Sequence, residues 1–541
     1  MSFHQREAAV WSTAALAGLL VYLFVSFSDL TVYPPVGEDE PWIAAAPYKL
    51  ASEGVYGSDL FAGYYGVERH NYQHMPLYPL VQAGIFRLFG VGVLQMRVLP
   101  VACGFLLLLV TFLVGRQAGG GRLGALAIVL LVALRVMDGN DATGILLLDR
   151  ARINRYDIAV PLFGLLALAA LNRAGKDRGT KWTATAGALA GLSSLTHLFG
   201  AFWLPVLLGT LVIRRGPRVV LTRASWALLA GFVVPWLPWA AYIATGWPDF
   251  VGQMRFVADR LDLLNPSFYL SNAIDGEGPI SIRWGLRMIR ELPLARLGTW
   301  VMLAGTPAAV GIMLWRTRLR PGDPEFGLAA AALTQTLMFL FLLKVKTVTY
   351  MIGLWPIVVL CLAWLGLWLW DRATPALARV ALGTVVALVV IEGGARVAHA
   401  RSVARRATPY DSYTSQVAGC IPAGSLVLGL QHYWLGLRQY RYRTWLMPLN
   451  LAHPRYYHDP LTLDEALERV HPDVILVDRY VQAMLDEARP PEHSNHGYFV
   501  GFEAFIARRG VEPACVIRDR TYGTMIVYRV PGLRASAEPV R

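Results

Sequence analysis

Charged residues are scarce in this chain: Asp, Glu, Lys and Arg make up 16% of its 541 residues. A soluble globular domain carries about 25% charged residues, so this content argues against one. Apolar types instead make up 55% of the sequence, and the mean hydropathy is +0.43. This balance predicts a mainly α polytopic membrane protein.

Motifs for soluble nucleotides and for metals are also missing. There is no Gly-Lys-Ser/Thr phosphate loop, so no ATP site is expected. No His, Cys, Asp or Glu spacing is typical of a metal site, so no metal ligand is predicted. The net charge is +13, but no basic-aromatic motif for nucleic acid accompanies it. Most Lys and Arg residues fall in short loops between apolar runs, where they fix orientation and contact anionic lipid.

Only four cysteines are present. Cys103 and Cys361 lie in apolar runs, where a free thiol is usually packed in the core. Cys420 and Cys515 lie in the C-terminal region and could form a disulfide if that region is extracytoplasmic. The sequence leaves this pairing open.

The apolar runs predict about eleven membrane-spanning helices, each judged against the roughly 20 residues that a bilayer requires. They fall near 8–28, 97–115, 122–137, 157–172, 182–196, 198–213, 225–245, 298–315, 326–343, 351–370 and 378–396. Basic loops then place the N-terminus in the cytoplasm. Residues 1–400 are predicted to form the membrane domain, with outer loops 29–96, 138–156 and 246–297. We expect a multi-pass protein of the cell inner or plasma membrane.

The composition changes after about residue 405. Short strands are predicted at 424–430, 474–477 and 524–528, and a helix at 463–470 with Thr462 as its N-cap. Strand and helix alternate, so 401–541 is predicted to be a soluble, extracytoplasmic α/β domain. A short amphipathic helix at 42–53 is predicted to lie on the membrane surface.

Asp39 and Glu40 follow the first apolar run closely. The pair could simply mark the membrane edge or cap the next helix. Alternatively, a carboxylate near lipid has a raised proton affinity and can act as a general base on a hydroxyl. The sequence alone favours neither interpretation.

Other candidates lie on the same predicted side. Arginines around Arg152 and Arg155 suit a phosphate, or they pair with neighbouring acids such as Asp157, which could also cap a helix. Lys346 and Tyr350 follow a span on the outer side and suit a phosphate or ordinary anionic lipid. His74 could help to bind an anion beside Asp39, and His197 is more often a packing residue than a ligand.

These motifs, in this order, resemble those of the GT-C membrane glycosyltransferases, in the branch of protein O-mannosyltransferases and lipid A aminoarabinose transferases. The motifs that carry the resemblance are Gly37-Glu38-Asp39-Glu40, His74-Met75-Pro76-Leu77-Tyr78, Arg97-Val98-Leu99-Pro100, Ala151-Arg152 through Tyr156-Asp157, and Lys346 through Tyr350. The family's Lys-Pro-Pro-Leu-Tyr motif has a lysine and a proline where this chain has His74 and Met75.

The resemblance implies an inverting glycosyltransferase that uses a polyprenyl-phosphate-linked sugar on the outer face and a glycan, lipid or protein acceptor. It implies Asp39 and Glu40 as catalytic residues. It implies donor-phosphate binding by a set of six residues: His74, Arg97, Arg152, Arg155, Lys346 and Tyr350. A divalent metal ion is compatible with the fold but is given no ligands. A transporter or flippase for a lipid-linked anion, and a non-catalytic assembly or sensor protein, are the alternatives.

Overall fold

The structure is a computed structural model. It describes the residues in these ranges: 3–37, 39–136, 142–174, 179–258, 262, 264–275, 281–284, 286, 297–317, 322–344, 346–373 and 376–531. Glu38 and parts of the predicted outer loops 138–156 and 246–297 lie outside the described residues.

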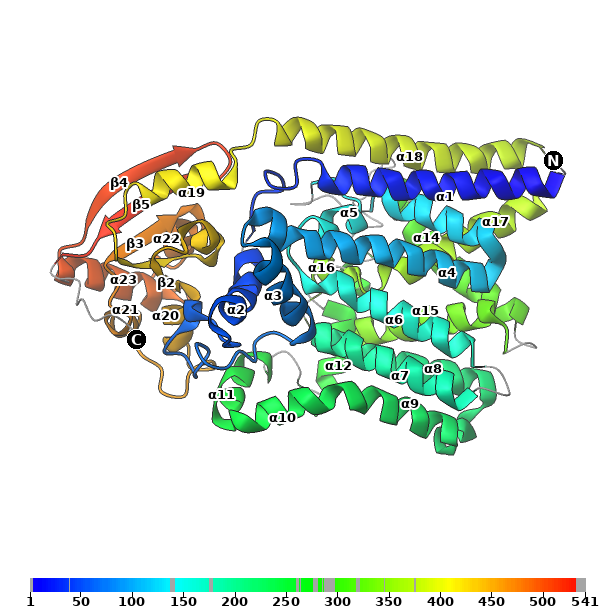
Figure 1. Cartoon of the computed structure of the whole chain (residues 1–541), viewed down its shortest axis with the longest axis horizontal. Helices are drawn as coiled ribbons and strands as arrows, with labels where there is room; N and C mark the ends of the chain where they lie inside the picture. Colours follow the sequence, from blue (N-terminus) through cyan, green and yellow to red (C-terminus); the bar gives the residue numbers. More distant parts are fainter. Residues whose placement is uncertain are drawn as a thin grey trace.

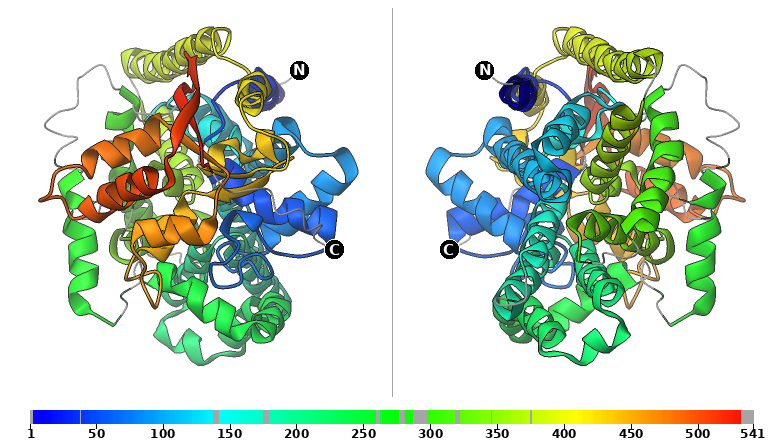
Figure 2. Two further views of the ribbon diagram at one scale, coloured as in Figure 1. Left: turned by 90° about the vertical axis from the view of Figure 1, so that its left-hand side faces the viewer. Right: turned by 90° about the vertical axis from the view of Figure 1, so that its right-hand side faces the viewer.

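A bundle of apolar helices forms the larger part of the molecule (Figure 1). Its helices are α1 (Phe3–Phe27), α4 (Val93–Ala133), α6 (Ala159–Asn172), α7 (Gly179–Thr196), α8 (Trp203–Arg215), α9 (Arg223–Val233), α10 (Leu237–Thr245), α14 (Leu297–Thr317), α15 (Pro324–Leu342), α17 (Trp355–Arg372) and α18 (Ala376–Ala404). Figure 2 looks along the long axis of the molecule, so that α1 is seen end-on.

The prediction of a polytopic membrane protein is confirmed. Within the described ranges, eight helices are long and apolar enough to cross a membrane. Every predicted span falls on a helix of the bundle. The precise number of crossings stays a prediction, because α4 contains two predicted spans and α6 is short.

Helix α4 is bent sharply at three consecutive glycines. Gly119 and Gly120 leave the helical conformation, and Gly120 has φ +83°, which favours glycine. The two arms fold back on each other closely: a Cβ on Gly115 would lie 2.8 Å from the Cα of Gly124. Small residues permit such close packing of helices in a membrane. The bend therefore separates the predicted spans 97–115 and 122–137.

Short elements connect the helices at the end of the bundle nearest the C-terminal domain. They are α2 (Asp39–Glu53), η1 (Asp59–Phe61), α3 (Leu77–Phe89), α5 (Leu146–Ala151), η2 (Tyr156–Ile158), η3 (Leu198–Phe202), α11 (Trp247–Ala258), α12 (Pro266–Asp275) and α16 (Val348–Met351). Two further short 3₁₀ turns, η4 (Pro217–Leu221) and η5 (Val234–Trp236), flank α9.

Helix α2 confirms the predicted helix at 42–53, but its predicted place on the membrane surface is wrong. Ile43 and Ala46 are buried within the protein. The helix packs against α3 and against η6 (Gln431–Leu437) of the C-terminal domain. The Tyr48 and Trp434 rings, for example, lie 5.4 Å apart. The apolar face is therefore covered by protein instead of by lipid.

The C-terminal domain is a five-stranded mixed sheet with helices, at the left of Figure 1. The strand order is β2-β1-β3-β5-β4, in which β2, β1 and β3 are parallel and β5 is antiparallel to both neighbours. The elements are α19 (Tyr410–Ala418), β1 (Leu426–Gly429), β2 (Arg441–Thr444), α20 (Leu446–Leu451), α21 (Leu463–Val470), β3 (Val474–Asp478), α22 (Arg479–Glu487), α23 (His496–Arg509), β4 (Glu512–Asp519) and β5 (Gly523–Arg529).

Several predictions for this domain are confirmed. The predicted strands correspond to β1, β3 and β5. Helix α21 begins as predicted, with Thr462 and Glu465 forming a capping box. Cys420 and Cys515, whose pairing the sequence leaves open, are joined by a disulfide bond.

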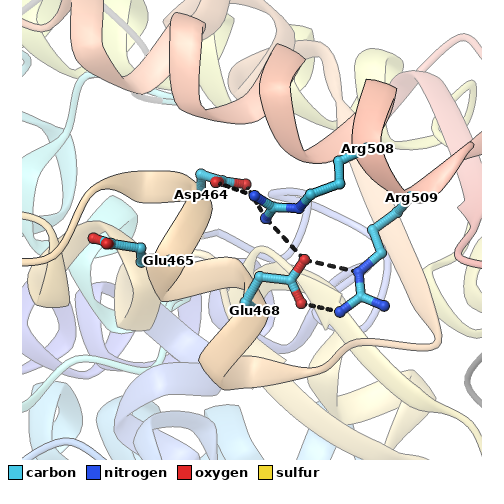
Figure 3. A pocket seen from close by; sticks show the side chains of 5 residues that line it. All are labelled: Asp464, Glu465, Glu468, Arg508 and Arg509. Atoms are coloured by element: carbon cyan, nitrogen blue, oxygen red, sulfur yellow. Dashed lines mark hydrogen bonds and ion pairs between the residues drawn. The ribbon is translucent and has the colours of Figure 1, made fainter.

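Ion pairs tie α21 to α23 on the outside of the domain (Figure 3). Arg508 donates to Asp464 at 2.5 and 2.7 Å and to Glu468 at 2.9 Å, and Arg509 also binds Glu468. These hydrogen bonds lower the pKa of Glu468 to about 2, the bond from Arg509 being the largest cause. Asp464 and Glu468 therefore neutralise the two arginines, while Glu465, which lines the same surface pocket, accepts hydrogen bonds from Thr462.

The two parts of the chain share one hydrophobic core. Ala44, Phe61, Phe86 and other apolar residues of the segment 36–96 pack in one cluster with buried residues of the C-terminal domain such as Trp434 and Trp445. The segment 36–96 therefore belongs to the core of the C-terminal domain as much as to the membrane bundle.

Candidate active site

A cavity of about 360 Å³ lies where the membrane bundle meets the segment 54–76. We call it the central cavity. Its lining comes from α2, the segment before α3, the segment before η2, η3, α11 and the segment around α16. The lining residues are Asp39, Trp42, Tyr72, Gln73, His74, Met75, Arg155, Tyr156, His197, Leu198, Phe199, Gln253, Met254, Thr347, Thr349 and Tyr350.

An acid and a base face each other in this cavity. Asp39, on the first turn of α2, forms an ion pair with Nη1 of Arg155. Arg155 also donates through Nε to Asp157 at 2.8 Å. Asp157 is buried, whereas the Asp39 side chain keeps 40% of its surface exposed. Asp157 therefore holds the guanidinium, and Asp39 is the carboxylate that a ligand can reach.

Aromatic rings form the wall beside this ion pair. The Tyr156 and His197 rings are stacked with centroids 5.0 Å apart, and Tyr350 lies 5.5 Å from His197. The guanidinium of Arg155 lies 5.9 Å from the centre of the Tyr156 ring. His197 accepts a hydrogen bond from the backbone of Phe199 through Nδ1. This bond fixes the ring at the start of η3.

His74 lies in the cavity wall but cannot supply a positive charge. Burial lowers its pKa to about 3, with a smaller contribution from His197. Its ring contacts Trp42 and Tyr156 at centroid distances of 5.0 and 5.8 Å. The lysine of the related motif is therefore replaced by a neutral aromatic residue, and any phosphate here needs a cation from another segment.

The structure does not bring Glu40 into the central cavity. Its side chain is 2% exposed and receives two bonds from Arg97, at 2.6 and 2.8 Å. The backbone N–H groups of Gly37 and Asn154 donate to the same carboxylate at 2.9 and 2.8 Å. Successive helical residues point about 100° apart, so Asp39 and Glu40 face different surroundings. Glu40 holds the chain in place, and Arg97 binds the Glu40 carboxylate, so it is not available for a donor phosphate.

Asn154 extends this buried network to the His74–Tyr78 motif. Its side chain donates to the Glu40 carbonyl at 3.0 Å and accepts from Tyr78 and Gln82 at 2.8 and 2.7 Å. One amide thus links α2, α3 and the segment that carries Arg155. The network fixes the place of Asp39 and Arg155 relative to each other.

Two further predicted phosphate ligands lie outside the central cavity. Arg152 donates to the carbonyls of Ser28 and Tyr33 at 2.6 and 2.8 Å, beyond the end of α1. Lys346 is buried beside the cavity and donates to the carbonyl of Asn272 at 2.5 Å. Desolvation lowers the pKa of Lys346 to about 8.

The residue types present do not fit a metal ion. Within the described ranges, no three His, Cys, Asp or Glu side chains gather closely enough to hold one. Asp39 pairs with Arg155, and Nδ1 of His197 accepts from the backbone of Phe199. We therefore derive no step through a metal.

Sequence reasoning missed several residues that shape the site. Trp42 donates to Gln73 at 3.1 Å, and Tyr156 stacks on His197. Asn154 centres the buried network. Asn154 and Tyr156 lie inside the Arg152–Asp157 motif. Because their side chains are uncharged, the search for charged phosphate ligands did not select them.

Comparisons with known proteins agree with this fold. Residues 73–242 match the family model described as dolichyl-phosphate-mannose-protein mannosyltransferase. The crystal structure of ArnT from Cupriavidus metallidurans bound to undecaprenyl phosphate matches with a TM-score of 0.61 and 16% identity, covering 96% of this chain and 98% of that chain. The oligosaccharyltransferase AglB from Archaeoglobus fulgidus, in complex with an inhibitory peptide and a dolichol-phosphate, also matches. Its TM-score is 0.57 and its identity 12%, and the match covers 97% of this chain and 74% of that chain. No curated protein matches the chain.

The chain therefore has the fold of the GT-C membrane glycosyltransferases. The predicted resemblance to the branch of protein O-mannosyltransferases and lipid A aminoarabinose transferases is confirmed at the level of the fold, and the mannosyltransferase family model matches residues 73–242. The matched segment 73–242 includes His74, Arg155 and His197 of the central cavity.

Proposed function

We propose that this protein transfers a sugar, a hexose or a pentose, from a polyprenyl-phosphate-linked donor to a hydroxyl group of a glycan, lipid or protein. The observation that carries the proposal is the central cavity itself. There a reachable carboxylate, Asp39, and a guanidinium, Arg155, face one space at the end of the membrane helices. The ArnT and AglB structures, each with a polyprenyl-type phosphate bound, support the choice of donor.

The transfer step follows from these two groups. The Asp39 carboxylate accepts the proton of the acceptor hydroxyl as its oxygen attacks the anomeric carbon. The bond between this carbon and the phosphate oxygen breaks, and the polyprenyl phosphate leaves with the bonding electrons. Attack from the face opposite the phosphate inverts the anomeric centre.

The guanidinium of Arg155 stabilises the leaving phosphate. Arg155 has five N–H donors and uses Nε for Asp157 and Nη1 for Asp39, so further donors can reach an oxyanion. Thr349, which lines the cavity, accepts a hydrogen bond from Arg150 at 2.9 Å. Developing negative charge in such a site is stabilised by donors that are already in place.

We also propose that the reaction takes place on the outer face of the cell inner or plasma membrane, with the N-terminus in the cytoplasm. The disulfide between Cys420 and Cys515 supports this, because disulfides persist in oxidising compartments outside the cytosol. An alkaline phosphatase fused after residue 531 is expected to be active. An inactive fusion with a stable full-length product contradicts the orientation.

The experiment for the transfer compares Asp39→Asn with Asp59→Asn. Asp59 is a half-exposed carboxylate of the same outer segment and pairs with Lys49, away from the cavity. Purified protein is given undecaprenyl-phosphate-linked hexoses and pentoses with a panel of acceptors, and released undecaprenyl phosphate is measured. Loss of a general base is expected to slow transfer by about 10²–10⁴-fold, with donor binding kept. Equal rates for Asp39→Asn and the wild type would exclude Asp39 as the base.

We propose separately that transfer needs no metal ion. Since the described residues provide no metal-binding group of His, Cys, Asp or Glu, we expect transfer to persist in EDTA. Loss of activity in EDTA that Mg²⁺ or Mn²⁺ restores would contradict this.

A further inference from the structure

One wall of the central cavity is formed by α2 and the short segment that leads into α3. Trp42 of α2 lines the cavity together with Gln73 and His74 of this segment. The Trp42 and His74 rings contact each other, with centroids 5.0 Å apart. We call these three residues the Trp42 wall. Asp39 and Arg155 line the same cavity, so the Trp42 wall can contact a substrate of the proposed transfer.

The side-chain amide of Gln73 has a fixed orientation. Trp42 donates its indole N–H to Oε1 of Gln73 at 3.1 Å. An indole nitrogen can only donate a hydrogen bond, so the oxygen of the amide, and not its NH₂ group, has to face Trp42. Among the described residues, none accepts a hydrogen bond from that NH₂ group. The N–H donors of the Gln73 side chain therefore remain for a ligand in the cavity.

Hydrogen bonds within the segment hold Gln73 in this place. Its backbone N–H donates to Oδ1 of Asn71 at 3.1 Å, and the backbone N–H of Asn71 donates to the carbonyl of Tyr56 at 2.8 Å. The Tyr56 hydroxyl donates to the carbonyl of His74 at 3.3 Å. Asn71 and His74 are both buried. The Trp42 wall is therefore supported by a network of its own, as selective recognition requires.

The charges in the cavity are balanced before a substrate binds. Asp39 and Arg155 form an ion pair with each other. His74 is neutral, because burial lowers its pKa to about 3. Nδ1 of His197 accepts a backbone N–H, so this nitrogen carries no proton and the ring is neutral. No other lining residue in the described ranges is charged at neutral pH. The Trp42 wall therefore offers hydrogen bonds but no counter-charge.

These features determine which groups the Trp42 wall can bind. A hydroxyl oxygen of a sugar accepts a hydrogen bond from the NH₂ group of Gln73. A protonated amine in the same place has only donors, so it would meet the Gln73 amide donor to donor. Burying an ammonium group without a carboxylate is also costly, and Asp39 is already paired with Arg155. The Trp42 wall therefore favours a hydroxyl group over an amine.

We infer that Gln73 is a specificity-determining residue, whose amide donates to a hydroxyl group of the transferred sugar and selects neutral sugars over amino sugars. This inference rests on the proposed function. Trp42 is the positioning residue, because its indole N–H sets the direction of the amide. The cavity volume of about 360 Å³ is near the lower end of the roughly 300–1,000 Å³ of small-molecule sites. This size suits a single sugar better than a longer glycan.

The first test measures donor selection by the full-length protein in detergent. Undecaprenyl-phosphate-linked sugars are supplied in pairs that differ in one hydroxyl group replaced by an amine, at each ring position in turn. At one position the wild type is expected to bind and transfer the hydroxyl member at least about tenfold better, because the amine leaves polar groups unmatched. Binding is measured by calorimetry, and transfer by the release of undecaprenyl phosphate.

Gln73→Glu is expected to reverse this preference. The new carboxylate keeps one oxygen for Trp42 and turns the other towards the cavity, where it accepts from an ammonium group. The ratio between the two members should therefore shift by at least about tenfold towards the amine. Gln416→Glu is the matched control, because Gln416 is exposed on α19 and lies outside the cavity. It adds the same charge and should keep the wild-type ratio.

Trp42→Phe tests the orientation of the amide without adding a charge. It keeps an aromatic ring and removes the indole N–H, so the Gln73 amide can turn its oxygen towards the cavity. The preference for the hydroxyl member is expected to fall towards equal use of both members. Trp247→Phe is the control, because Trp247 is 58% exposed and does not line the cavity. It should keep the wild-type preference.

Three results would overturn the inference. Equal binding of both members of every pair by the wild type shows that the Trp42 wall does not select hydroxyl groups. An unchanged ratio in Gln73→Glu or in Trp42→Phe, with the variant folded, assigns the selection to other residues. A wild type that prefers the amine member contradicts the direction of the amide. Failure of the proposed function alone is distinguishable, since the wild type would then transfer no sugar while the preference in binding is still measured.

Discussion

The Glu40–Arg97 pair allows a stability prediction that separates a structural role from a catalytic one. Arg97 is fully buried and Glu40 is 2% exposed, and they meet in two hydrogen bonds. Glu40→Gln keeps the size of the side chain but leaves Arg97 without a counter-charge. Removing one partner of a buried ion pair costs about 3–5 kcal/mol.

The backbone around Glu40 adds to this cost. The N–H groups of Gly37 and Asn154 donate to the same carboxylate, and an amide NH₂ would face donors instead of accepting from them. Each buried donor left without a partner costs about 1–3 kcal/mol. We therefore expect Glu40→Gln to lie at the upper end of the range.

The assay is thermal unfolding of the detergent-solubilised protein, followed by tryptophan fluorescence at one scan rate because large membrane proteins often unfold irreversibly. Glu40→Gln and Arg97→Gln should each lower the apparent Tm by several degrees. The double variant should lose clearly less than the two single losses combined, because no isolated charge remains. Additive losses would refute the coupling. An unchanged Tm with abolished transfer would show that Glu40 takes part in the chemistry.

Three further predictions follow from buried or linked groups. The pKa of His74 in the folded protein, about 3, is far below the unfolded value of about 6.5. The contribution of His74 to stability is therefore full above pH ~6.5 and decreases as the pH falls toward 3. His74→Gln should make the apparent Tm depend less on pH over this range, and an unchanged slope would contradict a buried, neutral His74. The pKa of Lys346 in the folded protein, about 8, is below the unfolded value of about 10.4, so stability should decrease as the pH falls from about 10 to 8. Lys346→Met should remove this part of the pH dependence of the apparent Tm, and an unchanged profile in the variant would contradict the burial of the ammonium group. Loss of the disulfide between Cys420 and Cys515, 95 residues apart, should destabilise the protein by about 2–5 kcal/mol. The measurement is unfolding with and without reductant, with Cys420→Ser as the check, and no change would mean that the bond is absent in solution.

The helices could be predicted from the sequence because each apolar run is a local signal. The runs near 97–115 and 122–137 fall on the two arms of α4, and Gly119–Gly121 marks the bend. The capping box of Thr462 and Glu465 was equally local. The number of membrane crossings needs the packing of short helices such as α6, which composition alone does not give.

The candidate site was predictable only in part. Asp39, His74, Arg155, His197 and Tyr350 do meet in one cavity. The pairing of Glu40 with Arg97, 57 residues along the chain, is a tertiary fact without a local signal.

Arg152 and Arg155 show the limit most clearly. They are three residues apart, yet Arg152 lines a second cavity beside the C-terminal domain and Arg155 lines the central cavity. The segment between them is not helical, so spacing could not assign their sides. The neutral state of His74 likewise depends on burial, which the motif does not reveal.

The core shared by the segment 36–96 and the C-terminal domain has a consequence for the order of events during synthesis. The residues of the C-terminal domain that pack in one cluster with Phe61 and Ala44 begin near Tyr410, about 350 residues later in the chain. At roughly 5–20 residues per second, the ribosome needs on the order of 20–70 seconds to supply them. During that time the loop that carries Asp39 is complete but has no surface to pack against. Under the proposed function, the newly made protein would stay inactive until the C-terminal domain has been made and has packed against this loop.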